Sequence, residues 1–162
     1  MITVKVNFDH HEKIAANLEA RVSQIVMAVA LGVEGEAKRS IMQRKSKYRR
    51  YYVTRGRVVA RKKNGKVVGG RVRRVRREHW SSAPGDPPNT DTGFLANSIF
   101  SRRLTKYKAQ AYCTARYGLP LELGWITKSG KRVQARPYMR PALEKYRPRF
   151  VRMIQGALRD YK

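Results

Sequence analysis

The sequence has a single cysteine and three histidines, and it lacks a long hydrophobic run. One cysteine, Cys113, excludes a disulfide within the chain and is typical of a reducing cytoplasm. The most apolar run, Ile25 to Val33, contains Gly32 and is too short to cross a bilayer. Met1 to Val6 alternates between apolar and polar residues, so we expect a strand there and no secretory leader. These features predict a protein made in the cytoplasm.

Patterns for catalysis and metal binding are also missing. No phosphate-binding glycine–lysine loop, nucleophile elbow or zinc-ligand spacing occurs. Asp9, His10, His11 and Glu12 carry metal-binding groups, but adjacent histidines point to different faces of a helix and no second cluster supports them. An exposed helix start is the favoured interpretation. We therefore expect no enzyme activity, no cofactor and no bound metal.

The remaining chemical groups are isolated. Asp86 and Asp91 lie in turn contexts, where aspartate usually bonds to nearby backbone, so capping outweighs acid–base catalysis. Glu122 is the next carboxylate along the chain after these two aspartates. His79 has no expected partner. Cys113 follows an alternating pattern, which favours a small buried hydrophobic residue over a catalytic thiol.

Acidic residues are scarce, with 11 Asp and Glu against 37 Lys and Arg and a formal net charge of +26. Between Lys38 and Arg77 there are 18 basic residues and no acidic one. The other 19 basic residues face all 11 acidic ones, so the rest of the chain carries only +8. This excess favours a polyanionic or acidic partner. The basic stretch is therefore a segment distinct from the rest of the domain, which is only mildly basic.

Hydrophobic periodicity predicts a long helix near the start of the chain. Apolar residues recur at three- and four-residue steps from Ile14 to Val33, after a helix start at Asp9. The helix should continue to Ile41, with Gly32 and Gly35 as its weak points.

The stretch at about residues 48–78 is expected to be a β-hairpin insertion, called the arm below. Asn64-Gly65 predicts a tight two-residue turn between two segments with strand propensity. A two-stranded hairpin is marginal in water, so the arm should become ordered against a partner. Alternation makes both of its faces positive. The residues expected to contact DNA or a partner are Arg55, Arg57, Arg61, Lys62, Lys63, Lys66, Arg71, Arg73, Arg74, Arg76 and Arg77.

Three uses of the arm are open: a solvated ribbon, contact with nucleic-acid phosphate, or contact with acidic surfaces of neighbouring subunits. So many positive charges without an acid are unusual for a solvated face. Tyr48, Tyr51 and Tyr52 are able to stack on bases, although packing on a core is favoured for them. No helix-turn-helix or finger pattern predicts sequence-specific readout.

The second half should add short elements. Asp91 or Thr92 is expected to cap the first of them, Pro141 suits the start of the last helix, and Pro148 should kink or divide that helix. The expected elements are a short helix over 95–98, antiparallel strands over 99–104 and 109–115, a helical turn over 120–123, an exposed loop over 125–134 and a helix over 141–158. Residues 1–162 should therefore form one α+β domain. It combines an antiparallel sheet of about four strands, a long N-terminal helix, a C-terminal helix and the arm.

Three short blocks in this half are the most informative feature. They are Ser82-Ala83-Pro84-Gly85-Asp86-Pro87-Pro88 running into Asp91-Thr92-Gly93-Phe94-Leu95-Ala96-Asn97-Ser98-Ile99, then Tyr117-Gly118-Leu119-Pro120-Leu121-Glu122-Leu123-Gly124, then Ala135-Arg136-Pro137-Tyr138-Met139-Arg140-Pro141-Ala142-Leu143. In this order they resemble the neck or tail-completion (head–tail joining) protein family of tailed bacteriophages. The resemblance covers residues 81–160, extends loosely to the N-terminal helix and leaves out the arm.

The resemblance implies a virion structural protein at the head–tail junction. Such proteins form a ring, hexameric by family resemblance, around the DNA channel and join the connector to the tail. The implied partners are connector, head-closure and tail-terminator proteins, together with double-stranded DNA through phosphate contacts, and no membrane. The block residues expected to be structural are Pro84, Gly85, Pro87, Asp91, Thr92, Gly93, Leu95, Tyr117, Leu121, Glu122, Gly124, Arg136, Pro137, Tyr138, Arg140, Pro141 and Leu143.

The apolar block residues near turns suit either a core or a subunit contact, and core packing is favoured for each. They are Tyr117, Leu121, Leu123, Tyr138 and Met139. The alternative function is a ribosomal or nucleoid-type nucleic-acid-binding protein with a basic hairpin extension. Size, charge and arm fit that interpretation, whereas the three blocks do not.

Overall fold

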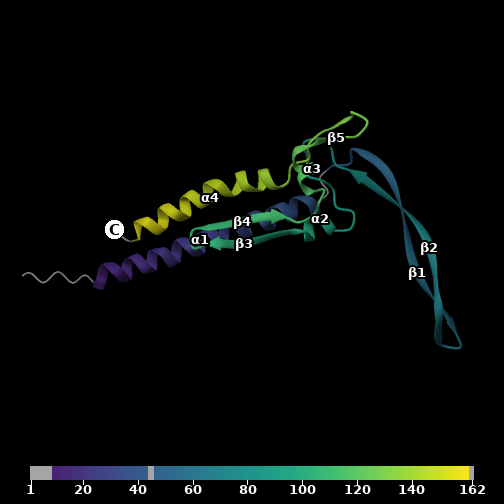
Figure 1. Ribbon diagram of the computed structural model, residues 1–162, viewed down its shortest axis with the longest axis horizontal. Coiled ribbons are helices and arrows are strands. Elements are labelled where there is room, and N and C mark those ends of the chain that lie inside the picture. Colours follow the sequence, from purple (N-terminus) through teal and green to yellow (C-terminus); the bar gives the residue numbers. More distant parts are fainter. Residues whose placement is uncertain (1–8, 44–45, 161–162) are drawn as a thin grey trace, which may run out of the picture.

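The computed structural model describes residues 9–43 and 46–160. A long helix, α1, forms the base of the body, and α4 and the β3–β4 hairpin pack against it (Figure 1). The strand expected over residues 2–8 lies outside the described residues. The elements are α1 (Asp9–Met42), β1 (Arg49–Lys63), β2 (Lys66–Ser81), α2 (Phe94–Asn97), β3 (Ile99–Thr105), β4 (Lys108–Cys113), α3 (Gly118–Leu123), β5 (Trp125–Ile126), β6 (Arg132–Val133) and α4 (Met139–Arg159).

The core lies at the C-terminal end of α1. The predicted apolar stripe of this helix is confirmed, and its last members, Val33, Ala37 and Ile41, are buried. They pack against residues from α2, β3, the loop after β4 and the start of α4, namely Leu95, Ala96, Ile99, Ala115, Tyr138 and Ala142. The burial of these side chains supplies the hydrophobic stabilisation that holds the second half of the chain on α1.

By length and composition, Glu12–Met42 of α1 is apolar enough to cross a membrane. One such helix near the start of a chain is weak evidence for a span, because the core helix of a soluble protein meets the same criteria. Here α1 packs along α4, β3 and β4.

Gly32 does not weaken α1 but lets α4 approach it. The helix runs unbroken through Gly32 and Gly35. A Cβ atom on Gly32 would lie 2.2 Å from the Tyr146 ring, whereas a Cβ atom on Gly35 would meet nothing within 4 Å. The absence of a side chain at Gly32 thus creates the recess for Tyr146.

We expect Gly32→Ala to destabilise the protein although alanine is the better helix former. The added methyl group forces Tyr146 out of its recess, and such overpacking costs about 1–3 kcal/mol. Gly35→Ala is the matched control, because the exposed position gains only helix propensity, worth about 0.5–1 kcal/mol. Urea denaturation of the two variants measures the difference. An equal gain in stability at both positions would contradict the tight α1–α4 contact.

The described strands form three separate two-stranded antiparallel sheets: β1–β2, β3–β4 and β5–β6. The mixed helix and sheet, α+β, character is therefore confirmed, and so is the antiparallel pair over 99–113. A sheet of about four strands does not occur among the described residues, because β1–β2 leaves the body. The segment over 125–134, expected as a plain exposed loop, contains the short β5–β6 pair.

The arm is the hairpin β1–β2, and it projects away from the helical body (Figure 1). Asn64 and Gly65 have φ angles of 49° and 76°, which confirms the predicted turn with both central residues at positive φ. Strand β1 has 15 residues, so at about 3.3 Å per residue the arm is about 50 Å long.

One expected helix feature is narrowed and another is wrong. α4 continues through Pro148 as one helix, so of the two expected outcomes, a kink or a division, the division does not occur. The N-cap of α2 is Gly93, with a φ angle of 78° and no side-chain cap bond, instead of Asp91 or Thr92. Thr92 Oγ1 does accept a hydrogen bond from the Phe94 N–H, at 3.3 Å. The Asp91 side chain instead lies beside His79 at the base of the arm.

Candidate nucleic-acid and assembly interface

Basic residues occupy opposite register positions on the two strands of the arm. The register pairs Lys63 with Lys66 and Arg57 with Arg73. Like charges at directly opposite positions destabilise an antiparallel pair. The ribbon therefore gains stability wherever an anion approaches it.

The expected contact residues all lie on the two strands of the arm. Those with described side chains are exposed: Lys63, Lys66, Arg74, Arg76 and Arg77. The others occupy strand positions in the same ladder: Arg55, Arg57, Arg61 and Lys62 on β1, and Arg71 and Arg73 on β2. The structure thus brings these residues together on one ribbon outside the body.

The three tyrosines at the arm base are exposed, so the expectation of core packing is wrong. Tyr48, Tyr51 and Tyr52 are 55%, 42% and 45% exposed. The arm leaves the body before these side chains reach the core. The Arg76 guanidinium lies 4.0 Å from the centre of the Tyr52 ring, a cation–π contact that keeps aromatic and basic groups adjacent.

The base of the arm is fixed to the body by hydrogen bonds. Asn89 Nδ2 donates to the carbonyl oxygens of Ser46, at 2.6 Å, and Trp80, at 2.9 Å. The Ala83 N–H donates to Ser46 Oγ at 2.8 Å. The entry and exit of the arm are therefore held side by side.

His79 has a partner that the sequence did not indicate. Its Nε2 lies 2.8 Å from Asp91 Oδ1, and both side chains are largely shielded from solvent. Asp91 was expected to cap a turn, but it instead joins β2 to the segment before α2. This contact is a second connection between arm and body.

The three sequence blocks meet in the structure around Arg136. Its backbone N–H donates to the Leu121 carbonyl oxygen at 2.7 Å, and its Nε donates to the Ser82 carbonyl oxygen at 3.2 Å. The Gly85 N–H donates to the Ala135 carbonyl oxygen at 2.9 Å. Segments that are separated by up to about fifty residues along the chain thus form one unit, which we call the block cluster.

Glu122 caps the helix that follows the third block. Its Oε2 accepts from the N–H groups of Tyr138, at 2.8 Å, and Met139, at 3.0 Å, and its Oε1 accepts from the Arg140 N–H at 2.8 Å. The next residue, Pro141, has no N–H to satisfy. The carboxylate therefore bonds the free donors at the start of α4, where negative charge is favourable.

This role of Glu122 escaped the sequence-based interpretation, although a signal was present. The N-cap of α4 is Tyr138, which makes no side-chain cap bond. A helix start without Ser, Thr, Asp or Asn leaves its free N–H groups to water or to an acceptor from elsewhere in the chain.

The block residues differ in burial. Leu95 and Tyr138 are buried; Pro87, Asp91, Gly93, Leu121, Glu122, Gly124, Arg136 and Pro137 are half-buried; Pro84, Gly85, Thr92, Tyr117, Arg140, Pro141 and Leu143 are exposed. Core packing is right for Tyr138, and Leu121 and Met139 pack against the core. It is wrong for Tyr117 and Leu123, which are 45% and 70% exposed.

Tyr138 and Cys113 adjoin each other inside the block cluster. Burial, a hydrogen bond with the Cys113 thiol and the nearby Glu122 carboxylate raise the pKa of the Tyr138 phenol above its ordinary value. The phenol is therefore neutral at pH 7. Cys113 is half-buried and packs against the core, as a small hydrophobic residue does.

Within residues 9–43 and 46–160 no group of three His, Cys, Asp or Glu side chains is placed to hold a metal ion. The side chains of Asp9, His10 and His11 lie outside the described set. The absence of enzyme activity stays a prediction.

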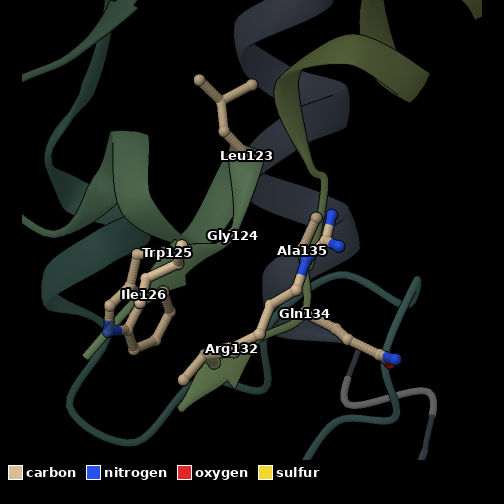
Figure 2. Close-up of a pocket in the computed structure, with 8 residues that line it drawn as sticks. Leu123, Gly124, Trp125, Ile126, Arg132, Gln134 and Ala135 are labelled. Atoms are coloured by element: carbon tan, nitrogen blue, oxygen red, sulfur yellow. The ribbon is translucent and has the colours of Figure 1, made fainter. Parts of the chain in front are cut away.

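The end of the body beside the block cluster exposes apolar side chains. Gly124, with a φ angle of 76°, turns the chain there, and a Cβ atom on it would lie 2.7 Å from the Val133 carbonyl oxygen. Figure 2 shows the open pocket of about 620 Å³ between the segments 123–126 and 132–135. Leu123 and Ile126 at this end are 70% and 71% exposed. Large apolar side chains are therefore exposed to solvent at this end of the body.

No protein-family profile, no curated protein and no solved structure matches this chain.

Proposed function

We propose that this chain is a head–tail joining protein of a tailed bacteriophage. It forms a ring around the DNA channel, contacts the connector and tail proteins through its body, and contacts DNA phosphate through its arm. The observation that carries the proposal is the block cluster. The three blocks that resemble the neck family meet around Arg136 and Glu122, as expected for segments with one shared structural role.

The apolar end of the body supports the assembly part of the proposal. A ring needs two different patches on each subunit, one for each neighbour. The β5–β6 end, with Leu123 and Ile126, supplies one candidate. A face of α1 supplies the other. We also keep the expected sheet of about four strands as part of this proposal. The β3–β4 pair has two strands, so a larger sheet needs further strands that do not belong to the described pairs.

The arm favours one alternative function. An exposed basic ribbon also suits a ribosomal or nucleoid-type protein, which would bind nucleic acid as a monomer or dimer. In that case the exposed apolar end of the body would have no ring neighbour to cover it. The mass of the assembled protein therefore separates the two functions.

We expect the purified, nuclease-treated protein to form a particle of several subunits. A hexamer would weigh about 112 kDa, six times the 18.7 kDa of one chain. Ile126→Asp should reduce this mass without unfolding the protein, because it places a charge in an apolar contact. Leu158→Asp is the control, since this exposed leucine is in the last turn of α4, and the C-terminal end of α4 lies far from β5 (Figure 1).

Light scattering coupled to gel filtration measures the masses of the wild-type protein and of the two variants. A wild-type protein that stays at 18.7 kDa up to high concentration, with or without duplex DNA, would contradict the ring. Equal assembly of the two variants would remove the β5–β6 end from the interface.

A further inference from the structure

An apolar groove of about 920 Å³ runs between α1, β4 and α4. Val26, Val29 and Val33 of α1 line it, together with Leu143 and Phe150 of α4. A third side is formed by β4, and residues 122–123, 135 and 137 also line the groove. Most of the exposed lining is apolar, so the groove favours an apolar occupant over water.

The groove follows the free edge of β4. Five consecutive residues, 107–111, line it, and no residue of β3 does. Side chains along a strand alternate between its two faces, so consecutive residues border one groove only where that groove runs along the strand edge. Among the described strands β4 pairs with β3 alone, which leaves its second edge without a strand partner. Such an edge is a template for an added strand.

The sequence contains a segment suited to this place. Ile2, Val4, Val6 and Phe8 alternate with Thr3, Lys5 and Asn7, so an extended chain would present one apolar face. The groove extends at least from Val26 to Val33, about 10 Å along α1 at 1.5 Å per residue, which matches three to four residues of a strand.

The segment cannot fill this groove in its own chain. Helix geometry places Val26 about 26 Å from Asp9 and Val33 about 36 Å from it. Eight fully extended residues span at most about 28 Å, before any allowance for the reversal at Asp9. A second copy of the chain has no such limit.

We propose that residues 1–8 of one copy occupy the groove of the next copy and pair with the free edge of β4. The donor and acceptor surfaces differ, so the contact is heterologous and leads to a ring or a filament. This inference rests on the proposed ring and identifies one of its contacts. It also supplies a third strand beside β3 and β4.

Deleting residues 2–8 tests the contact. We expect the variant to fall to the mass of a single truncated chain, below the 18.7 kDa of the full-length chain, under conditions in which the wild type assembles. Replacing the polar alternates, Thr3, Lys5 and Asn7, by serine is the control and should leave assembly intact. If the wild type assembles and the deletion variant keeps the same number of subunits, the strand exchange is wrong and the ring stands. If the wild type itself is monomeric, both proposals fail.

Cross-linking gives a readout that does not depend on the deletion variant folding. In a Cys113→Ser background, one copy carries Val4→Cys and a larger, tagged copy carries Ala109→Cys. Mild oxidation of the mixture should give a disulfide-linked pair of unequal chains. Leu158→Cys in place of Ala109→Cys is the control and should give none. Absence of the unequal pair from an assembled mixture would overturn the strand exchange.

Discussion

Removing the arm is expected to weaken binding to duplex DNA by a hundredfold or more at low salt while the body remains folded. The register pairs Thr54 with Arg76, so residues 55–75 can be replaced by Asn-Gly without moving the strand ends. The change removes nine basic residues and no acidic one. A loss of several phosphate contacts is an effect of about this size.

The salt dependence gives the sharper measurement. Each phosphate contact lowers the slope of log affinity against log salt by about 0.9, so a protein with six to ten contacts loses about 10³–10⁵ in affinity between 50 and 200 mM salt. We expect a steep slope for the full chain, a shallow one without the arm, and little dependence on DNA sequence in either case. Fluorescence anisotropy with two unrelated duplexes measures all three quantities.

A matched charge change separates the arm from net charge. Replacing Arg74, Arg76 and Arg77 by glutamine should reduce the affinity for DNA and the slope of log affinity against log salt. Glutamine at three exposed α4 positions, Arg147, Arg152 and Arg159, removes the same charge and should have much less effect. Equal losses from the two sets would show that the arm has no special contact with DNA. If armless protein binds DNA normally but no longer joins its neighbours, the arm connects subunits instead.

Glu122→Ala is expected to produce a large loss of stability for a single substitution. It leaves the N–H groups of Tyr138, Met139 and Arg140 without their acceptor. Hydrogen bonds to a charged group are worth about 1.5–3 kcal/mol each and do not add fully, so we expect a loss of about 3 kcal/mol. For a chain of this size that corresponds to a fall in melting temperature of about 6–12 °C.

Two further variants identify the cause. Glu122→Gln keeps one carbonyl oxygen as an acceptor and should lose less stability than Glu122→Ala. Glu144→Gln removes the same charge from α4, where Glu144 makes only an exposed pair with Arg140, and should change stability by less than about 0.5 kcal/mol. Differential scanning calorimetry measures the series. Equal effects of the two glutamine substitutions would mean that charge, and not the cap, is responsible.

Local patterns predicted the elements that depend on near neighbours in the chain. The stripe from Ile14 to Val33 indicated α1 because helix periodicity is a property of one segment. Asn64-Gly65 located the arm turn for the same reason. The β3–β4 pair follows from two alternating runs with a short connection.

Contacts between distant segments were not predictable in this way. Glu122 is sixteen residues from Tyr138, and no pattern within either segment specifies their distance. The pairing of His79 with Asp91 depends on where the arm joins the body. The exposure of Tyr52 also depends on where the arm joins the body, because strand propensity does not specify whether a strand packs on the body or projects from it. The number of strands in one sheet is likewise a property of the whole fold.

The two ends of the arm are held side by side, so the length of the arm can change without a change in the body. The hydrogen bond between Ser46 and Ala83 lies at the base of the arm, outside both of its strands. Removing one residue from each strand shortens the reach by about 3.3 Å and exchanges the two faces of the ribbon, whereas removing two from each shortens it by about 6.6 Å and restores them. The length of the arm can therefore change while the fold of the body stays the same, and in the proposed ring that length would set how far the arm reaches into the channel.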